Sequence, residues 1–458
     1  MTMATVNAGA RLDRLPISSF HRRIMWLIGA GMFFDGFDLY LLGPVLGATI
    51  ATKFALPSQA PQFISMTFIG MTIGALVTGF VGDRFGRRFT YQVNLALFGL
   101  ASLAGAFAPN METLIGLRFL MGAGLGAEIV VGYGTMTEFV PPQSRGRWLG
   151  MMAFIVVAGF PMTAVAANFL IPLFGWQVMF VIAGVGALIV WYLRKALPES
   201  PRWLEAQGRT QEAEDLMQKI EAEASGGQPL PPAPPAPAPA APPTLGSLLT
   251  PALLPRLVVG SIVLIVINTL IFGFVTNMPT FFVQQGRTLG SSLGLNMFIS
   301  LGSLPGCVIG AWAADYWGRK PTIIAASALA IVAGFVYPMV TEPALVILAG
   351  LCLIVPIYIL TAILYGVYTA EIFPTEVRLT CNGICNFFGR GFTVITPFII
   401  FPLFKDHGVQ GVVWMMIGLL VVQIIGVALW GVETRQRTLE EVAVDKPDAA
   451  GNPSRATA

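Results

Sequence analysis

The sequence Phe-Phe-Asp-Gly-Phe-Asp-Leu-Tyr, residues 33–40, places two carboxylates in the middle of an apolar run that extends from about residue 24 to residue 50. About 20 apolar residues suffice for a helix to cross the hydrocarbon core of a bilayer. An ionised aspartate near the centre of that core costs about 2.5 to 3.5 kcal/mol, so water, a cation or a proton must compensate it. Asp35 and Asp38 are three positions apart, on one side of a helix. We therefore interpret this run as the wall of a polar pathway through a membrane.

The composition extends this interpretation to the whole chain. Of the 458 residues, 55% are hydrophobic and 11% are charged, whereas charged residues make up about 25% of soluble domains. The net charge of +3 is spread over short loops, so we expect no nucleic-acid partner. The first twenty residues lack the pattern of a cleaved signal peptide, which predicts that the first span is retained. The four cysteines indicate neither a disulfide framework nor a metal site.

Apolar runs recur along the chain and predict an all-α membrane protein with twelve transmembrane helices in two six-helix halves. Most of the 27 lysines and arginines fall on the side that carries both termini, so the positive-inside rule predicts that both termini are cytoplasmic. The predicted spans are residues 24–50, 61–81, 89–108, 112–139, 148–173, 176–197, 256–284, 291–313, 321–340, 344–373, 379–404 and 411–432.

These runs divide the chain into five segments. They are a cytoplasmic N-terminal tail (1–23), an N-terminal half (24–197), a cytoplasmic insert (198–255), a C-terminal half (256–432) and a cytoplasmic C-terminal tail (433–458). In the insert we expect an amphipathic helix from Arg209 to about Ala224. The Pro/Ala tract at 229–243 is typical of a semi-extended linker, and the alternative is a Pro-rich docking ligand.

Two motifs of the first half recur in the second. Glu-Phe-Val-Pro at 138–141, with Arg145, returns 233 positions later as Glu-Ile-Phe-Pro at 371–374, with Arg378. Gly-Asp-Arg-Phe-Gly-Arg-Arg at 82–88 returns as Ala-Asp-Tyr-Trp-Gly-Arg-Lys at 314–320. A nearly constant offset indicates two parallel repeats, and in such transporters the substrate binds between the repeats near the middle of the membrane.

These motifs resemble those of the major facilitator superfamily along nearly the whole chain. The resemblance rests on Gly79-x-x-x-Asp83-Arg84-x-Gly86-Arg87-Arg88 and on Arg118-x-x-x-Gly122-x-Gly124-x-Gly126. The two Glu-x-x-Pro-x-x-x-Arg motifs and residues 198–202 are similar to those of sugar porters. Residues 35–38 instead resemble the first-helix signature of aromatic acid:proton symporters, and bacterial nicotinate carriers and the synaptic-vesicle-protein-like group are also similar.

The charged loops are candidate gates, because arginines that bind carboxylates and helix ends can hold one conformation closed. In the second copy Tyr316 stands in place of Arg84 and Ala311 in place of Gly79, which predicts a weaker clamp there. The alternative is that these charges only set the topology. The predicted gating residues are Asp83, Arg84, Arg87, Arg88, Glu138, Arg145, Asp315, Arg319, Glu371 and Arg378.

Counting 1.5 Å per helical residue places Asp35, Asn268 and Arg390 at similar depth, so we expect them to meet in one cavity. The same count predicts a pair between Asp38 and Arg118. Glu128 is a third acid within the spans, against only two arginines.

One acid is therefore left to carry a proton. Arg390 keeps its charge and suits the anchoring of a carboxylate, with aromatic rings beside it for stacking. The alternatives are a buried structural network for the aspartates, an interhelical brace for Arg390, and a hydrogen-bonded core acid for Glu128. The predicted proton-coupling residues are Asp35, Asp38, Arg118 and Glu128. The predicted substrate-binding residues are Arg390, Asn268, Asp35, Phe37, Tyr133, Tyr365 and Phe388.

Together these features predict a monomeric, proton-coupled importer of a small aromatic or pyridine monocarboxylate in a bacterial-type inner membrane, with benzoate, hydroxybenzoate or nicotinate as candidates. Alternatives are a sugar or polyol symporter, an organic-cation or drug exporter, and a sensor or scaffold that does not transport. We expect no cofactor, no metal ion and no enzyme activity, because the sequence has no metal-ligand cluster, phosphate-binding loop or activated nucleophile.

Overall fold

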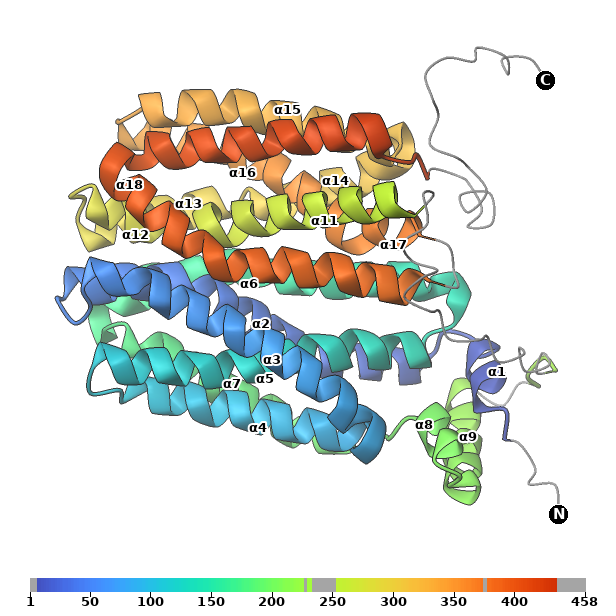
Figure 1. Cartoon of the computed structure of the whole chain (residues 1–458). Helices are drawn as coiled ribbons and strands as arrows, with labels where there is room; N and C mark the ends of the chain where they lie inside the picture. Colours follow the sequence, from blue (N-terminus) through green and yellow to red (C-terminus); the bar gives the residue numbers. More distant parts are fainter. Residues whose placement is uncertain (1–5, 226–228, 233–252, 374–376, 435–458) are drawn as a thin grey trace, which may run out of the picture.

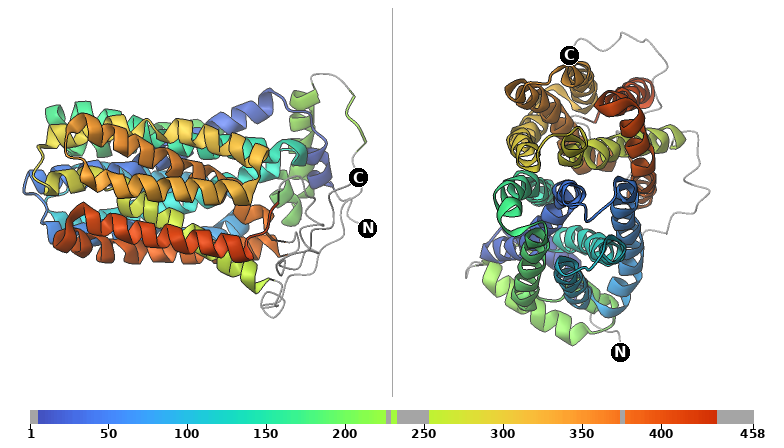
Figure 2. Two further views of the ribbon diagram at one scale, coloured as in Figure 1. Left: turned by 90° about the horizontal axis from the view of Figure 1, so that it is seen from above. Right: turned by 90° about the vertical axis from the view of Figure 1, so that its left-hand side faces the viewer.

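The computed structural model describes residues 6–225, 229–232, 253–373 and 377–434, and within those ranges every regular element is helical. The helices of each half form a bundle, and Figure 2 shows the two bundles side by side when viewed along the helices. The short helices α1 (Ala8–Asp13), α8 (Pro201–Ala206) and α9 (Thr210–Ser225) lie together at one end of the molecule (Figure 1). We call this the α9 end and the opposite end the far end.

The first half consists of six long helices. Two of the breaks between them are glycines in the left-handed region, Gly86 (φ 93°) and Gly175 (φ 80°), where a side chain would strain the backbone. The helices are α2 (Ser19–Ala51), α3 (Ala60–Phe85), α4 (Arg87–Ala106), α5 (Met111–Phe139), α6 (Pro142–Phe174) and α7 (Gln177–Leu193), with the short turns η1 (Pro57–Gln59) and η2 (Arg194–Ala196).

The second half repeats this plan with more interruptions. Two of its helices contain π-helical segments, η3 (Thr269–Val275) and η5 (Leu364–Tyr368). The remaining elements are α11 (Leu254–Asn268), α12 (Met278–Gln284), α13 (Leu289–Ser300), α14 (Ser303–Trp317), α15 (Arg319–Val336), η4 (Tyr337–Met339), α16 (Pro343–Ile363), α17 (Thr369–Glu371) and α18 (Arg378–Trp430).

The described residues contain 11 helices that are long and apolar enough to cross a membrane. The sequence predicts twelve, and the difference lies in α18. Its 53 residues are interrupted at Gly408, where φ is 63° and ψ is −161°, and its two arms fold back along each other (Figure 1). The predicted all-α membrane fold is confirmed, and so is the helix expected in the insert. The Pro/Ala tract lies almost entirely outside the described residues.

Glycines set how closely the helices of the first half approach. A Cβ at Gly122 would collide with the backbone of Thr67 on α3, and one at Gly126 would collide with Met71. Gly124 faces α4 instead, where a Cβ would lie 2.8 Å from Phe98 Cβ. Small residues allow such close packing of helices in a membrane. Since Arg118 is four positions before Gly122, this packing turns Arg118 toward α3 as well.

A second close crossing positions the two aspartates. A Cβ on Gly159 of α6 would lie 2.7 Å from the carbonyl carbon of Gly36, between Asp35 and Asp38. Thr163 Oγ1 donates a hydrogen bond to the carbonyl of Phe37 at 3.1 Å. Helix α6 is therefore fixed against the aspartate motif by backbone contact.

The two halves are joined by hydrogen bonds near the middle and toward the far end. Tyr358 donates to the hydroxyl of Tyr40 at 2.9 Å, and Thr280 Oγ1 donates to the carbonyl of Gly43 at 3.0 Å. Ser65 Oγ donates to the carbonyl of Val394 at 2.7 Å.

Candidate functional site

The first component of the site is a buried ion pair between α2 and α5. Arg118 Nη1 donates to Asp38 Oδ1 at 2.9 Å, which is the contact that helical depth predicts. Arg118 Nε donates to Thr67 Oγ1 at 3.1 Å, and the guanidinium lies 5.6 Å from the ring centre of Phe63. Both charged side chains are completely buried. Burial strengthens the attraction but makes the pair intolerant of losing either partner.

A second buried ion pair involves Arg194, which lies near the end of the sixth predicted span and was expected among the cytoplasmic cations. Arg194, in the turn after α7, is fully buried and pairs with Glu128 of α5. Its Nε and Nη2 donate to the carbonyls of Leu27 and Ile28 on α2, both at 2.8 Å. Arg194 corrects the expected count of three acids against two bases, because its side chain turns back into the bundle.

Asp35 is the acid of this region without a partner. It is 1% exposed, and neither of its carboxylate oxygens has a hydrogen-bond partner among the described residues. Its electrostatic neighbours are Glu128, Arg194 and Asp38. With Arg194 the count becomes three acids against three arginines, but within the first half Asp35, Asp38 and Glu128 still face only Arg118 and Arg194.

The second half supplies a polar cluster around Asn268, at the point where α11 passes into the π-helical segment η3. Tyr365 of η5 donates to Asn268 Oδ1 at 2.7 Å, and Asn268 Nδ2 donates to the carbonyl of Leu264 at 2.7 Å. A Cβ on Gly389 of α18 would lie 3.0 Å from Asn268 Nδ2. This close approach brings the next residue, Arg390, to the edge of the cluster.

The side chain of Arg390 has no hydrogen-bond or ion-pair partner that the described residues provide. Its Nη1 is buried and has no hydrogen-bond partner in the described part of the chain. Tyr365 interacts electrostatically with Arg390 and with Tyr133 of the first half. No hydrogen bond or ion pair among the described residues joins Asp35 to Arg390, so these residues belong to two separate clusters of contacts.

The predicted aromatic residues differ in where they lie. Phe37 is buried in the first half beside Phe33 and Phe34. Phe388 is 51% exposed, and it is two positions from Arg390, which places the two side chains on opposite sides of α18. The expected stacking of Phe388 beside Arg390 is therefore disfavoured by helix geometry.

The first charged loop, residues 82–88, forms a clamp with Glu138 and Glu199. Arg87 Nε and Nη2 donate to Glu138 Oε1 at 3.2 and 3.1 Å. The backbone amides of Arg87 and Arg88 donate to Glu199, whose carboxylate caps the start of α4. Arg84 is exposed and lies over the ring of Phe85 at 5.5 Å. The side chain of Asp83 lies outside what the structure describes.

The second gating loop repeats these contacts. Arg319 Nε and Nη2 donate to Glu371 at 3.0 and 3.2 Å, and Asp315 lies 3.2 Å from Arg319 Nη1. The amides of Arg319 and Lys320 both donate to Glu433 at 2.9 Å. These contacts give no support to the expectation of a weaker second clamp. The side chain of Arg378 is outside the described set.

Sequence reasoning missed the two capping glutamates. Glu199 and Glu433 occupy equivalent places after the sixth and twelfth predicted spans, and each binds the first amides of the helix that follows its gating loop. A carboxylate at a helix N-terminus is favoured by the free amides and the helix dipole. The signal was present as Glu-Ser at 199–200 and Glu-Thr at 433–434.

The α9 end is held together by ion pairs of the tail before α2. Arg11 Nη1 donates to Glu214 at 2.5 Å, and this hydrogen bond holds the pKa of Glu214 below its ordinary value. Asp13 lies 2.7 Å from Arg202 and 3.6 Å from Arg145. The predicted gating residue Arg145 is thus engaged with α1.

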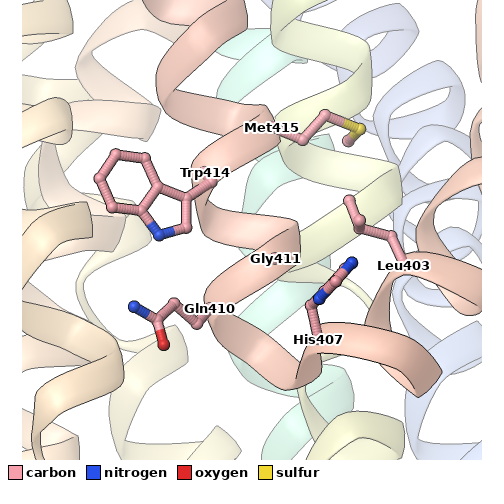
Figure 3. Close-up of a pocket in the computed structure, with 6 residues that line it drawn as sticks. All are labelled: Leu403, His407, Gln410, Gly411, Trp414 and Met415. Carbon is pink, nitrogen blue, oxygen red and sulfur yellow. The ribbon is translucent and has the colours of Figure 1, made fainter.

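A surface hollow of about 520 Å³ lies away from all of these charges, beside the break in α18 (Figure 3). None of the buried acids or arginines lines it, so it is not the candidate site. Its lining residues are Leu403, His407, Gln410, Gly411, Trp414 and Met415.

Comparison with known proteins gives concordant matches. A model of the Major Facilitator Superfamily matches residues 28–397. The chain is 34% identical to the inner membrane metabolite transport protein YdjE of Escherichia coli (strain K12), over 95% of this chain and 98% of that protein. It is 29% identical to the niacin transporter NiaP of Acinetobacter baylyi, over 95% and 99% respectively.

A solved structure also matches in fold. The xylose transporter XylE from E. coli, in a partially occluded inward open conformation, superposes with a TM-score of 0.72 and 18% sequence identity. The match covers 92% of this chain and 100% of that chain.

Proposed function

Because the chain belongs to the Major Facilitator Superfamily and is an integral membrane transporter, we propose that it imports a small aromatic or pyridine monocarboxylate together with protons. It is not an enzyme. The similarity to a niacin transporter favours a pyridine carboxylate such as nicotinate, with benzoate and hydroxybenzoate as the related aromatic acids.

One observation carries the proposal: among the described residues, a buried acid of the first half and a buried guanidinium nitrogen of the second half have no hydrogen-bond partner. Such groups are costly in a membrane protein unless a ligand or a proton satisfies them. Arg390 can bind a carboxylate through two parallel hydrogen bonds. Asp35 can bind a proton, so that the substrate anion and the proton are carried together.

The arrangement of contacts supports alternating access. We place the α9 end in the cytoplasm of a bacterial-type inner membrane, since the basic loops gather there. The described hydrogen bonds between the halves lie near the middle and the far end, which supports a state open toward the cytoplasm. The clamps around Arg87 and Arg319 act as gates in this proposal, and the protein works as a monomer.

In the proposed cycle Asp35 binds a proton while the far end is open. The substrate carboxylate then binds Arg390, with Asn268 and Tyr365 fixing the position of the π-helical segments beside it. The halves rock, and the proton and substrate leave at the α9 end. The empty protein returns with its acids protonated or paired with arginine.

Uptake by the purified chain in proteoliposomes tests this proposal. Radiolabelled nicotinate or benzoate should accumulate when the lumen is more alkaline than the outside. Arg390→Ala should abolish binding, and Arg390→Lys should bind more weakly because lysine lacks the planar fork of arginine. Asp35→Asn should retain binding and substrate exchange but lose accumulation. Lys405→Ala, which removes an exposed cation from the same helix, is the control.

The competing functions give different results in the same assay. Inhibition by unlabelled xylose would indicate a sugar symporter, and inhibition by a quaternary ammonium ion would indicate a cation exporter. Accumulation of nicotinate or benzoate that does not respond to the pH gradient would remove the proton step.

A further inference from the structure

The pair of Glu128 and Arg194 has no part in the cycle described above, yet it lies directly beside Asp35. We propose that Asp35 shares its proton with Glu128, the partner of Arg194, and that the proton leaves toward the α9 end through this shared site. The inference rests on the proposed proton coupling, and it assigns a role to Glu128 and Arg194, which the proposed cycle does not use.

Three elements of the first half build this site. Asp35 comes from α2, Glu128 from α5 and Arg194 from the turn after α7, and all three are at least 98% buried. Arg194 is fixed by its two hydrogen bonds to backbone carbonyls of α2. Its guanidinium also lies 4.6 Å from the ring centre of Tyr91, on α4.

A glycine leaves the space in which the pair sits. A Cβ at Gly31 would lie 2.7 Å from Arg194 Cζ and 2.8 Å from Glu128 Oε1. Gly31 is four positions before Asp35, so both face the same side of α2, one helical turn apart. The unpartnered carboxylate of Asp35 is therefore directed at the pair from the neighbouring turn.

The charge of the cluster requires a proton. Two carboxylates share one guanidinium, and the groups that face them are Tyr91, which is uncharged, and Asp38, which is already paired with Arg118. A lone negative charge buried in the bundle is costly, and two close carboxylates cannot readily both be ionised. One proton shared between Asp35 and Glu128 neutralises the cluster.

The position of the cluster gives the transfer a direction. Arg194 binds carbonyls seven and eight positions before Asp35 in α2, which is about 10 to 12 Å closer to the α9 end. When the proton passes from the Asp35 carboxyl to the Glu128 carboxylate, Arg194 exchanges its ionic partner from Glu128 to Asp35. No charge is created or lost, and the proton has moved toward the cytoplasmic side.

The first test needs no substrate. The full-length chain, reconstituted in lipid, is titrated with pH while infrared spectroscopy follows the carbonyl band of protonated carboxyl groups. We expect Asp35→Asn to remove intensity from this band. We expect Glu128→Gln to shift the pH at which the remaining band titrates by about one unit or more, because the two acids share a proton. Asp406→Asn, at an exposed acid, is the control and should change neither.

The second test separates proton transfer from a structural brace. Glu128→Gln should retain nicotinate exchange but lower accumulation driven by the pH gradient by about tenfold, equivalent to one unit of proton affinity. Glu128→Gln combined with Arg194→Gln removes both charges of the ion pair. If the pair only supports the fold, the double variant should accumulate nicotinate as the wild type does. That result would overturn the proposal.

The two tests distinguish this inference from the proposed function. If the wild-type chain transports neither nicotinate nor benzoate, the proposed substrates are wrong, but the infrared titration still decides whether the acids share a proton. If Glu128→Gln titrates as the wild type does, there is no shared site, whatever the transport assay gives.

Discussion

At the scale of single residues, the buried pair of Asp38 and Arg118 is a feature that we expect to tolerate substitution poorly. Both side chains are completely buried, and Asp38 Oδ2 and Arg118 Nη2 have no hydrogen-bond partner among the described residues. The attraction between the two charges therefore rests on the single contact between Arg118 Nη1 and Asp38 Oδ1. Removing one partner leaves an uncompensated charge, whereas removing both does not.

We expect Asp38→Asn to destabilise the purified protein by about 3 to 5 kcal/mol, the range for breaking a buried ion pair. Adding Arg118→Gln should recover much of this loss, because no charge is then left unpaired. Thermal unfolding in detergent measures the effect, with Asp406→Asn as the exposed control. A melting temperature unchanged by Asp38→Asn would show that water or another group compensates Arg118.

The sequence was informative about this pair because helical rise alone places both residues at the same depth. It was misleading about Arg194, which follows the last apolar residues of a span and was counted with the cytoplasmic cations. An arginine side chain is long enough to turn back into the bundle when carbonyls and a carboxylate are there to receive it. The unmatched Glu128 was the available signal, but it did not identify its partner.

At the scale of helices, glycine spacing decides which faces meet. Gly122 packs on the backbone of α3, whereas a Cβ at Gly116 of the same helix would have no atom within 4 Å. The two positions have the same residue type in one helix and differ only in their surroundings. They therefore form a matched pair for measuring close packing.

We expect Gly122→Ala to force α3 and α5 apart and to lower the melting temperature, with a cost of about 1 to 3 kcal/mol for overpacking. Gly116→Ala should be neutral or slightly stabilising, because alanine is the better helix former. Thermal unfolding of the two variants under one condition is the measurement. Equal melting temperatures would mean that the bundle relaxes at no cost around the added methyl group.

Hydropathy and the internal repeat sufficed to place most helices, because the length of an apolar run and the Pro/Gly breaks that end it can be read from neighbouring residues. They could not reveal the π-helical segments η3 and η5, since one extra residue in a turn leaves the apolar pattern almost unchanged. These segments border Asn268 and contain Tyr365, and π-helical turns are frequent at functional sites. The part of the second half that we propose for substrate binding was thus the part least visible in the sequence.

At the scale of the whole molecule, Gly43 allows the two halves to approach closely at the far end. A Cβ there would lie 2.8 Å from the carbonyl carbon of Thr276 and 3.3 Å from Asn277 Cα. The hydrogen bond from Thr280 to the Gly43 carbonyl lies at the same place. A large side chain at this position cannot be accommodated while the halves remain in contact.

We expect Gly43→Trp to act as a wedge and shift the population toward a state open at the far end. Spin labels at the exposed residues Leu56 and Gln285, one in each half, report this opening as a distance longer by several Å. Gly290→Trp is the control, because a Cβ at Gly290 meets no atom within 4 Å. If Gly43→Trp leaves the distance distribution unchanged, the residues around position 43 accommodate the tryptophan without separation of the halves.

The carboxylate of Glu433 caps the first turn of α15 from a position near the end of the chain, and Thr434 Oγ1 donates to Glu371 at 2.5 Å. The C-terminus should therefore not be truncated at the end of α18. A version trimmed for crystallisation, or joined to a reporter, has to retain both residues. A chain that ended at residue 432 would lose the carboxylate that binds the amides of Arg319 and Lys320, more than a hundred positions earlier in the sequence.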